Sequence, residues 1–270
     1  MKAFAKINLY LKVINKRDDG YHNLQMVNTK INICDIIYIS KSKDIDKIIY
    51  INDQISDISN NNLILKVLKE FKTKYNITTN YIIKIKKKIP YGAGLGGVSM
   101  DVGKVIEYIN KKEKLYLSKN QLIEFSKKYG ADIPYSLYDS PSIVEGIGEK
   151  ITKIKLDSKK FILICPDIYI STKDIFANHH IYNKEKTHLQ ILDDIYNRNY
   201  TNDLQLTTIN INKELKELNN YIQQFGQSFM TGSGSCFILD TKLNMKKVIK
   251  KIKQHYPLYK VQIIKTKKGK

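Results

Sequence analysis

Apolar and polar residues alternate at the start of the chain, where Phe4, Ile7, Leu9 and Leu11 lie among small and polar residues. Alternation with a period of two is typical of a strand with one buried face. The segment 82–89 repeats the pattern, with isoleucine on one side and lysine on the other. Both segments are therefore predicted to be strands.

Helical spacing replaces this alternation elsewhere. Leu63, Val67, Leu68 and Phe71 recur at intervals of about one turn, which predicts a helix with one apolar face. The segment 41–62 is polar and predicts a short strand and a loop. The other patterns predict strands at 26–40, 142–149, 160–165 and 261–264, helices at 99–109, 121–129, 214–225 and 243–256, and a strand, glycine turn and strand at 228–239.

The composition is that of a globular protein, with 42% hydrophobic and 27% charged residues. The apolar runs are short, so no membrane span is expected. The net charge of +20 raises the possibility of nucleic-acid binding. However, Arg17 and Arg198 are the only arginines among 46 basic residues, so 44 are lysine, spread over the whole chain. Lys, Ile, Asn and Tyr share A/T-rich codons, and a biased genome accounts for the charge without a specific nucleic-acid partner.

Three cysteines, Cys34, Cys165 and Cys236, lie in apolar segments without a CxxC spacing or a nearby histidine pair. An odd number with this spacing argues against a disulfide framework or a zinc site. We expect buried, reduced thiols and a cytoplasmic protein.

A glycine-rich segment, Pro90 to Ser99, separates a predicted strand from a predicted helix and has four glycines within six residues. Glycine permits a positive φ and close approach of a ligand to the backbone. The helix that follows offers unpaired N–H groups and the positive end of its dipole. The segment therefore predicts a phosphate-binding loop, with a simple flexible turn as the alternative.

Three kinds of phosphate loop share parts of this pattern. Gly92, Gly94 and Gly97 fit the dinucleotide fingerprint, but no apolar strand ending in an acidic residue follows at the required distance. Walker A spacing is also present, but Val98 stands where the lysine is needed. The remaining pattern is Pro-x-Gly-Ala-Gly-Leu-Gly-Gly-x-Ser.

This remaining pattern resembles the ATP loop of the GHMP small-molecule kinases. Four other segments resemble motifs of that family in the same order, and they select its cytidine-dependent branch. They are Ala5–Leu11 with Asp19–His22, Tyr129–Pro134, Val144–Glu149 and Thr231–Cys236.

The resemblance implies a two-domain α/β (α+β) GHMP kinase fold with the active site in the cleft between the domains. It implies a ribosomal-protein-S5-like, ATP-binding domain at 1–155 and a ferredoxin-like domain at 156–270. The implied reaction transfers the γ-phosphate of ATP, with Mg²⁺, to the 2-hydroxyl of 4-diphosphocytidyl-2-C-methyl-D-erythritol, in the non-mevalonate route to isoprenoids. A GHMP kinase of mevalonate or homoserine type and a basic nucleic-acid-binding protein remain alternatives.

Two residues match the catalytic positions of the family. Asp132, expected just after a helix end, matches the base that takes the proton of the acceptor hydroxyl. Lys6 matches the lysine that orients Asp132 and the hydroxyl and offsets charge on the transferring phosphoryl group. Asn8 is two residues further along the same predicted strand, so it faces the same side and is expected to contact the same substrate.

The remaining expected contacts involve the two nucleotides. Tyr21, His22, Thr172 and Phe176 match positions that hold the cytidine, with the base stacked between Tyr21 and Phe176. The expected ATP-binding residues are Pro90, Tyr91, Gly92, Ala93, Gly94, Leu95, Gly96, Gly97, Val98, Ser99 and Met100. The hydroxyl of Ser99, at the helix start, can bond phosphate or cap the helix, and the two roles are compatible. Val98 replaces a usual glycine, where a positive φ would be costly, and Met100 replaces a usual hydroxyl residue.

Overall fold

Two compact units make up the computed structural model, which describes residues 1–51 and 62–269. The first unit contains Met1–Ala5, Ile33–Ile89 and Gly96–Asp139, and the second contains Lys6–Asn32, Pro90–Leu95 and Ser140–Lys270. Two long strands, β1 (Lys2–Lys16) and β2 (His22–Ser42), contribute residues to both units.

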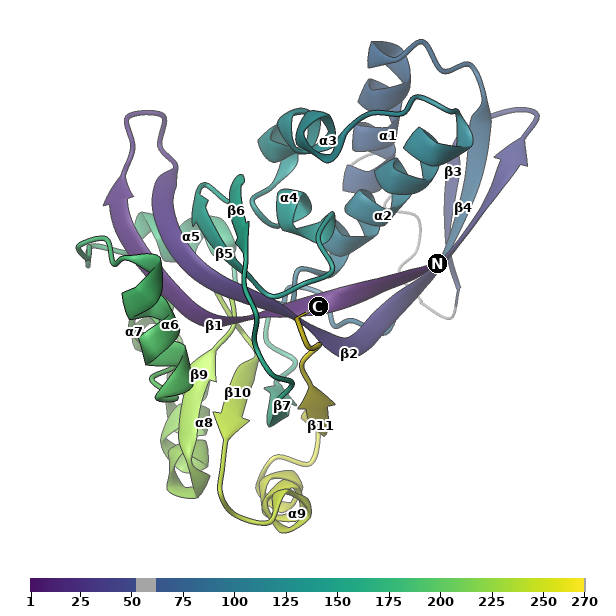
Figure 1. The fold of residues 1–270 in the computed structure, drawn as a ribbon. Helices are drawn as coiled ribbons and strands as arrows, with labels where there is room; N and C mark the ends of the chain where they lie inside the picture. Colours follow the sequence, from purple (N-terminus) through teal and green to yellow (C-terminus); the bar gives the residue numbers. More distant parts are fainter. Residues whose placement is uncertain (52–61, 270) are drawn as a thin grey trace. The chain divides into compact units, whose positions relative to one another are not determined.

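The first unit places helices on a small sheet. The C-terminal half of β2 pairs antiparallel with β4 (Asn80–Lys86), and β3 (Lys47–Ile51) pairs parallel with β4. Four helices lie together on one side of these strands (Figure 1): α1 (Leu63–Lys74), α2 (Gly97–Lys112), α3 (Lys119–Ser126) and α4 (Asp132–Ser136). A 3₁₀ turn at Lys127–Tyr129 separates α3 from α4.

The second unit contains two sets of paired strands. The N-terminal half of β2 pairs with β5 (Ser142–Gly146), which pairs with β6 (Lys150–Lys153), while β1 pairs parallel with β8 (Thr201–Asn202). In the described part of the chain, the other sheet has the order β11-β7-β10-β9, with all pairings antiparallel. Its strands are β7 (Lys160–Cys165), β9 (Gln227–Met230), β10 (Phe237–Asp240) and β11 (Lys260–Lys265).

Helices of the second unit close the core of this antiparallel sheet. Helix α8 (Lys213–Ile222) contributes Leu215, Leu218 and Ile222, and α9 (Met245–His255) contributes Val248 and Ile252. These side chains pack against buried residues of the strands, namely Ile162, Ile164, Met230, Phe237, Leu239 and Val261. The unit also contains α5 (Thr172–Ala177), α6 (His188–Tyr196) and α7 (Leu204–Ile211).

Hydrophobic periodicity predicted these elements with few exceptions. The segment expected as one strand at 142–149 is interrupted because Gly146 has φ +69°, and a turn then leads into β6. Helix α2 begins at Gly97, two residues before its predicted start, and the short helix α4 was not predicted. The short strand expected within 41–62 is β3, and the loop expected after it lies mostly outside the described residues.

The compact units follow a different division of the chain from the expected domains. Strands β5 and β6, which precede residue 155, belong to the same unit as the C-terminal sheet. The domains at 1–155 and 156–270 stay a prediction. Among the described helices, none is long and apolar enough to cross a membrane.

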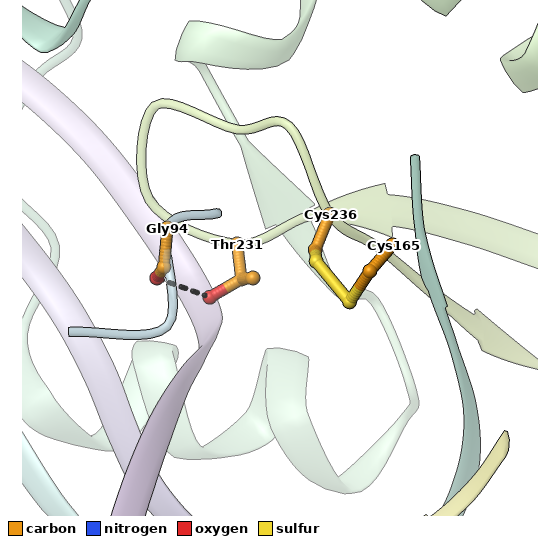
Figure 2. Close-up of a disulfide and its surroundings, with 4 residues drawn as sticks. All are labelled: Gly94, Cys165, Thr231 and Cys236. Atoms are coloured by element: carbon orange, nitrogen blue, oxygen red, sulfur yellow. Dashed lines mark hydrogen bonds between the residues drawn. A yellow bond between two sulfur atoms is a disulfide. The ribbon is translucent and has the colours of Figure 1, made fainter. Parts of the chain in front are cut away.

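The expectation of three reduced thiols was wrong, because Cys165 and Cys236 form a disulfide (Figure 2). Cys165 ends β7 and Cys236 directly precedes β10, and the register of these neighbouring strands places the two Cα atoms 4.5 Å apart. The 71-residue separation hides this proximity in the sequence. Cys34 is a free cysteine and is half-buried rather than buried.

Thiol titration tests the disulfide. Protein isolated and unfolded without reductant should expose one reactive thiol, from Cys34, and three after reduction. Since the cross-link closes a loop of 71 residues, reduction should lower the free energy of unfolding by up to about 4 kcal/mol, measured by chemical denaturation. Three reactive thiols before reduction would contradict the pairing.

Candidate active site

Alternate glycines of the glycine-rich loop have left-handed backbone conformations. Gly92, Gly94 and Gly96 have φ of +59°, +72° and +69°, so the sequence signal for a loop that needs glycine is confirmed at these three positions. Gly96 is the N-cap of α2 and supplies no side-chain cap, which suits the helix start to an anion.

The two departures in the loop have simple local consequences. Val98 is the second residue of α2 and has no positive φ, so the strain expected there does not arise. Met100 is buried in the helix face. Of the two roles open to Ser99, helix capping does not occur, because α2 begins two residues before it.

The backbone of the glycine-rich loop lies very close to the backbone of Thr231 at Gly94. A Cβ on Gly94 would lie 1.9 Å from the backbone oxygen of Thr231, so no larger residue fits without movement of the backbone. The Thr231 hydroxyl donates to the carbonyl of Gly94 at 3.3 Å (Figure 2). The next loop carbonyl, that of Leu95, accepts from the backbone N–H of Lys6 at 3.0 Å. The first part of the glycine loop is thereby fixed to β1 and to the Thr231–Cys236 motif.

Lys6 is buried in β1, with 3% of its surface exposed, and its ammonium donates to Asn8 Oδ1 at 2.9 Å. The same oxygen accepts from the backbone N–H of Gly232 at 2.8 Å. The backbone N–H of Asn8 donates to the Thr231 hydroxyl at 3.1 Å. The structure thus brings together the predicted residues Lys6 and Asn8 with the glycine motif, and the Asn8 amide serves the protein's own hydrogen bonds.

Two asparagines that the sequence analysis did not select complete this arrangement. Asn28 Oδ1 accepts from Asn8 Nδ2 at 2.6 Å. Asn202 Nδ2 donates to the carbonyls of Met230 and Gly232, each at 2.8 Å. Both are buried polar residues, Asn28 directly after the apolar pair Met26 and Val27 in β2 and Asn202 in the two-residue strand β8. The apolar neighbours of Asn28 are a signal that the sequence offers, whereas nothing comparable precedes Asn202.

The predicted cytidine residues include one aromatic cluster. The rings of His22 and Phe176 have centroids 5.0 Å apart, and Tyr182, which was not predicted, lies 6.3 Å from His22. His22 Nε2 is buried without a hydrogen-bond partner. Burial, with Lys16 and His179 nearby, lowers the pKa of His22. The imidazole is therefore neutral near pH 7, with a polar atom available to a ligand.

The other two predicted cytidine residues are placed differently. Thr172 starts α5, four residues before Phe176, and its hydroxyl lies 2.7 Å from that of Ser233. This contact connects α5 to the Thr231–Cys236 motif. Tyr21 follows the β1–β2 turn and is 57% exposed, so stacking of cytosine between Tyr21 and Phe176 stays a prediction.

Asp132 belongs to the first unit, where it is the first residue of α4 and half-buried. Helix α4 packs closely on α2, because a Cβ on Gly103 would lie 1.6 Å from the Ser136 hydroxyl. Gly103 therefore allows the contact that fixes the helix carrying Asp132. The role of the Asp132 carboxylate as a base stays a prediction.

Lys87, Asp35 and Asp101 form a buried cluster of ionisable side chains near the N-terminus of α2. Lys87 donates to Asp35 and, at 2.8 Å, to Asp101 of α2, while Asp35 accepts from the backbone N–H groups of Lys88 and Ile89. The cluster therefore joins the start of α2 to the segment that leads into the glycine loop at Pro90. Burial, with the second carboxylate at Asp35, raises the pKa of Asp101 to about 7 despite Lys87. Asp101 Oδ1 is buried without a hydrogen-bond partner, which suits a neutral acid.

No group of three or more histidine, cysteine or acidic side chains in the described residues is arranged to hold a metal ion. Among the predicted residues, the parts suited to a nucleotide are the glycine loop and the free N-terminus of α2.

The chain matches the model of the GHMP kinases N terminal domain over residues 62–140. A 4-diphosphocytidyl-2-C-methyl-D-erythritol kinase of Clostridium botulinum (strain Alaska E43 / Type E3) is 34% identical over 272 residues, covering 95% of this chain and 96% of the relative. The chain belongs to this kinase family. A further member, from Acinetobacter baylyi (strain ATCC 33305 / BD413 / ADP1), is 30% identical over 94% of this chain and 90% of its own.

Solved structures confirm the expected fold of the kinase. A 4-(cytidine 5'-diphospho)-2C-methyl-D-erythritol kinase matches with a TM-score of 0.81 at 20% identity, over 100% of this chain and 99% of that chain. The Methanococcus jannaschii mevalonate kinase matches with a TM-score of 0.64 at 17% identity, over 100% and 98% of the two chains. This chain therefore has the two-domain α/β fold that is common to both solved GHMP kinases.

Replacing Gly94 by alanine tests the close approach to Thr231. The variant should lose stability and raise the KM for ATP at least about tenfold, because a positive φ costs about 1–2 kcal/mol and the new Cβ displaces the loop. Gly20→Ala is a matched control, since Gly20 has φ +83° but open space around its Cβ position. Chemical denaturation and steady-state kinetics measure both effects, and equal losses in the two variants would contradict a steric role for Thr231.

Replacing Asp101 by asparagine tests the buried charges. Because its folded pKa is raised from 3.8 to about 7, Asp101 favours the folded state most below pH 4, and this contribution is lost as the pH rises to about 7. The asparagine variant should be more stable than the wild type at pH 8, by up to about 4 kcal/mol, with a flatter pH profile. Lys87→Met should instead lose about 3–5 kcal/mol, because it leaves two buried carboxylates. Urea denaturation from pH 4 to 8 distinguishes these outcomes, and an unchanged slope in the asparagine variant would exclude Asp101 as the titrating group.

Proposed function

We propose that this kinase transfers the γ-phosphate of ATP to the 2-hydroxyl of 4-diphosphocytidyl-2-C-methyl-D-erythritol. Its similarity to relatives of that name over almost the whole chain supports the proposal. The observation that carries the reaction is the buried Lys6 ammonium, held by Asn8 next to the backbone of the Thr231–Cys236 motif. This places a fixed positive charge within the same network that binds the glycine loop.

The proposed reaction forms a bond between the substrate oxygen and the γ-phosphorus and breaks the bond from that phosphorus to the β-phosphate bridging oxygen. Asp132 takes the proton of the attacking hydroxyl, and ADP leaves. The Lys6 ammonium offsets the charge on the transferring phosphoryl oxygens. Glycine-loop N–H groups, including those of Gly97, Val98 and Ser99 in the first turn of α2, hold the phosphates. Mg²⁺ bound to ATP would supply neutralisation of phosphate charge, and the described residues offer no acidic cluster of their own to hold it.

The aromatic cluster around His22 supports a cytidine substrate over mevalonate or homoserine. Neither of those alcohols contains a ring that could stack on Phe176 or a heterocyclic edge for His22 Nε2. Aromatic stacking contributes about 1–3 kcal/mol per base, which is enough to select among acceptors.

An ADP-release assay with each acceptor tests the substrate and the base together. Turnover should require the cytidine substrate, and Asp132→Asn should lower kcat by about 10²–10⁴-fold because the amide cannot accept the proton. Asp139→Asn is the matched control. Asp139 is the last residue of Gly96–Asp139, the stretch of the first unit that also contains Asp132, and its side chain is 67% exposed. This variant should retain wild-type kcat. Turnover of mevalonate or homoserine in place of the cytidine substrate would refute the substrate, and full activity of Asp132→Asn would refute the base.

A further inference from the structure

Asn28 is a polar residue on a buried strand of the second unit. It lies in β2, opposite Ser142 of β5, and it is fully buried beside Met26 and Val27. Buried asparagine is costly unless its amide is bonded. Asn28 Oδ1 accepts from Nδ2 of Asn8, which is also fully buried, at 2.6 Å.

The partners of Asn8 determine which way its amide points. The Lys6 ammonium and the backbone N–H of Gly232 are donors only, so the atom that faces them must be the oxygen of Asn8. The amide nitrogen then faces Asn28, where it needs an acceptor, and Asn28 Oδ1 supplies it. In the reversed orientation, the Asn8 NH₂ group would face both the ammonium and the N–H group. Asn28 therefore selects the one orientation in which Asn8 holds Lys6.

We propose that Asn28 is a positioning residue for phosphoryl transfer, which fixes the Asn8 oxygen that in turn holds the Lys6 ammonium and the backbone of Gly232. This inference rests on the proposed function of Lys6. Asn28 acts only through Asn8, and it sets where the positive charge stands during the reaction. A displacement of this charge weakens a preorganised electrostatic interaction, so it affects kcat more than KM.

A purely structural role would not need this pair. Two apolar side chains of similar shape could fill the same space with nearly neutral stability, whereas one unpaired amide is costly. The hydrogen bond of this pair also lies at the residue of β1 that holds Lys6. The hydrogen bond thus has a consequence for Lys6 that packing alone would not have.

The test compares Asn28→Leu, which removes the acceptor at similar size, with Asn28→Asp, which keeps an acceptor oxygen. In ADP-release kinetics with the cytidine substrate, the leucine variant should lose at least about tenfold in kcat with KM for ATP changed less than about threefold, while the aspartate variant should retain most of the wild-type kcat. Asn28→Ala replaces the leucine variant if that protein does not fold. An unchanged kcat in the folded leucine or alanine variant overturns the inference.

Asn219→Leu is the matched control for the loss of a buried asparagine. Asn219 is 4% exposed in α8 and accepts from Gln205 and Ser228, and neither of these hydrogen bonds involves Lys6 or Asn8. It should lower the unfolding temperature as Asn28→Leu does but leave kcat unchanged. An equal loss of kcat in the control would show that the effect is general destabilisation and would overturn the inference.

A double-variant cycle with Lys6→Met separates this inference from the proposed function. Lys6→Met should lower kcat strongly, and adding Asn28→Leu should then change the remaining kcat less than about twofold, because both act through the same ammonium. Independent, multiplicative losses overturn the positioning role of Asn28. If Lys6→Met retains wild-type turnover, the assignment of Lys6 is wrong and the inference fails with it. If only Asn28→Leu retains turnover, the inference fails and the proposed function stands.

Discussion

The second unit depends on the approach of Gly94 to the backbone of Thr231, which leaves no room for a side chain. This approach places the glycine loop beside the Thr231–Cys236 motif, although 136 residues lie between Gly94 and Thr231 in the sequence. Asn8 then bonds that motif from β1 through its backbone and its side chain. Three distant segments therefore share one hydrogen-bond network, and the Lys6 ammonium is part of it. A charge that is held in this way would need no rearrangement at the moment of the proposed reaction.

Buried charge has a comparable role in the first unit. Lys87 shares its ammonium between Asp35 and Asp101, and Asp35 also binds the backbone just before the glycine loop. One cation between two carboxylates leaves a net negative charge in a buried site, so one carboxyl is favoured in its neutral form. The start of α2 is thereby held by polar contacts of Asp101, which do not involve the N–H groups that are proposed to bind phosphate. The residues that hold the loop in place are thus different from the groups that are proposed to bind phosphate.

Local patterns in the sequence predicted what depends on local physics. Period-two and helical spacing identified most strands and helices, and the glycines at 92, 94 and 96 do have the positive φ that their spacing indicated. The sequence could not reveal the Cys165–Cys236 pair, because it depends on the register of β7 and β10. Asn28 and Asp101 were missed for the same reason: a single buried polar residue becomes meaningful only when its partner on another element is known. The substrate expectation came from the ordered motifs rather than from any single residue.

The net charge of the chain, +20, does not indicate which lysine has a function. Lysine accounts for 44 of the 270 residues, so a lysine at a given position says little about function. Lys6 is distinguished by burial, because removing an ammonium from water is costly unless polar groups replace the water. The Asn8 oxygen is one such group, and it is neutral. A neutral partner keeps Lys6 in place without cancelling its positive charge, whereas a carboxylate at residue 8 would neutralise it. An asparagine at this position therefore adds no negative charge of its own beside the ammonium.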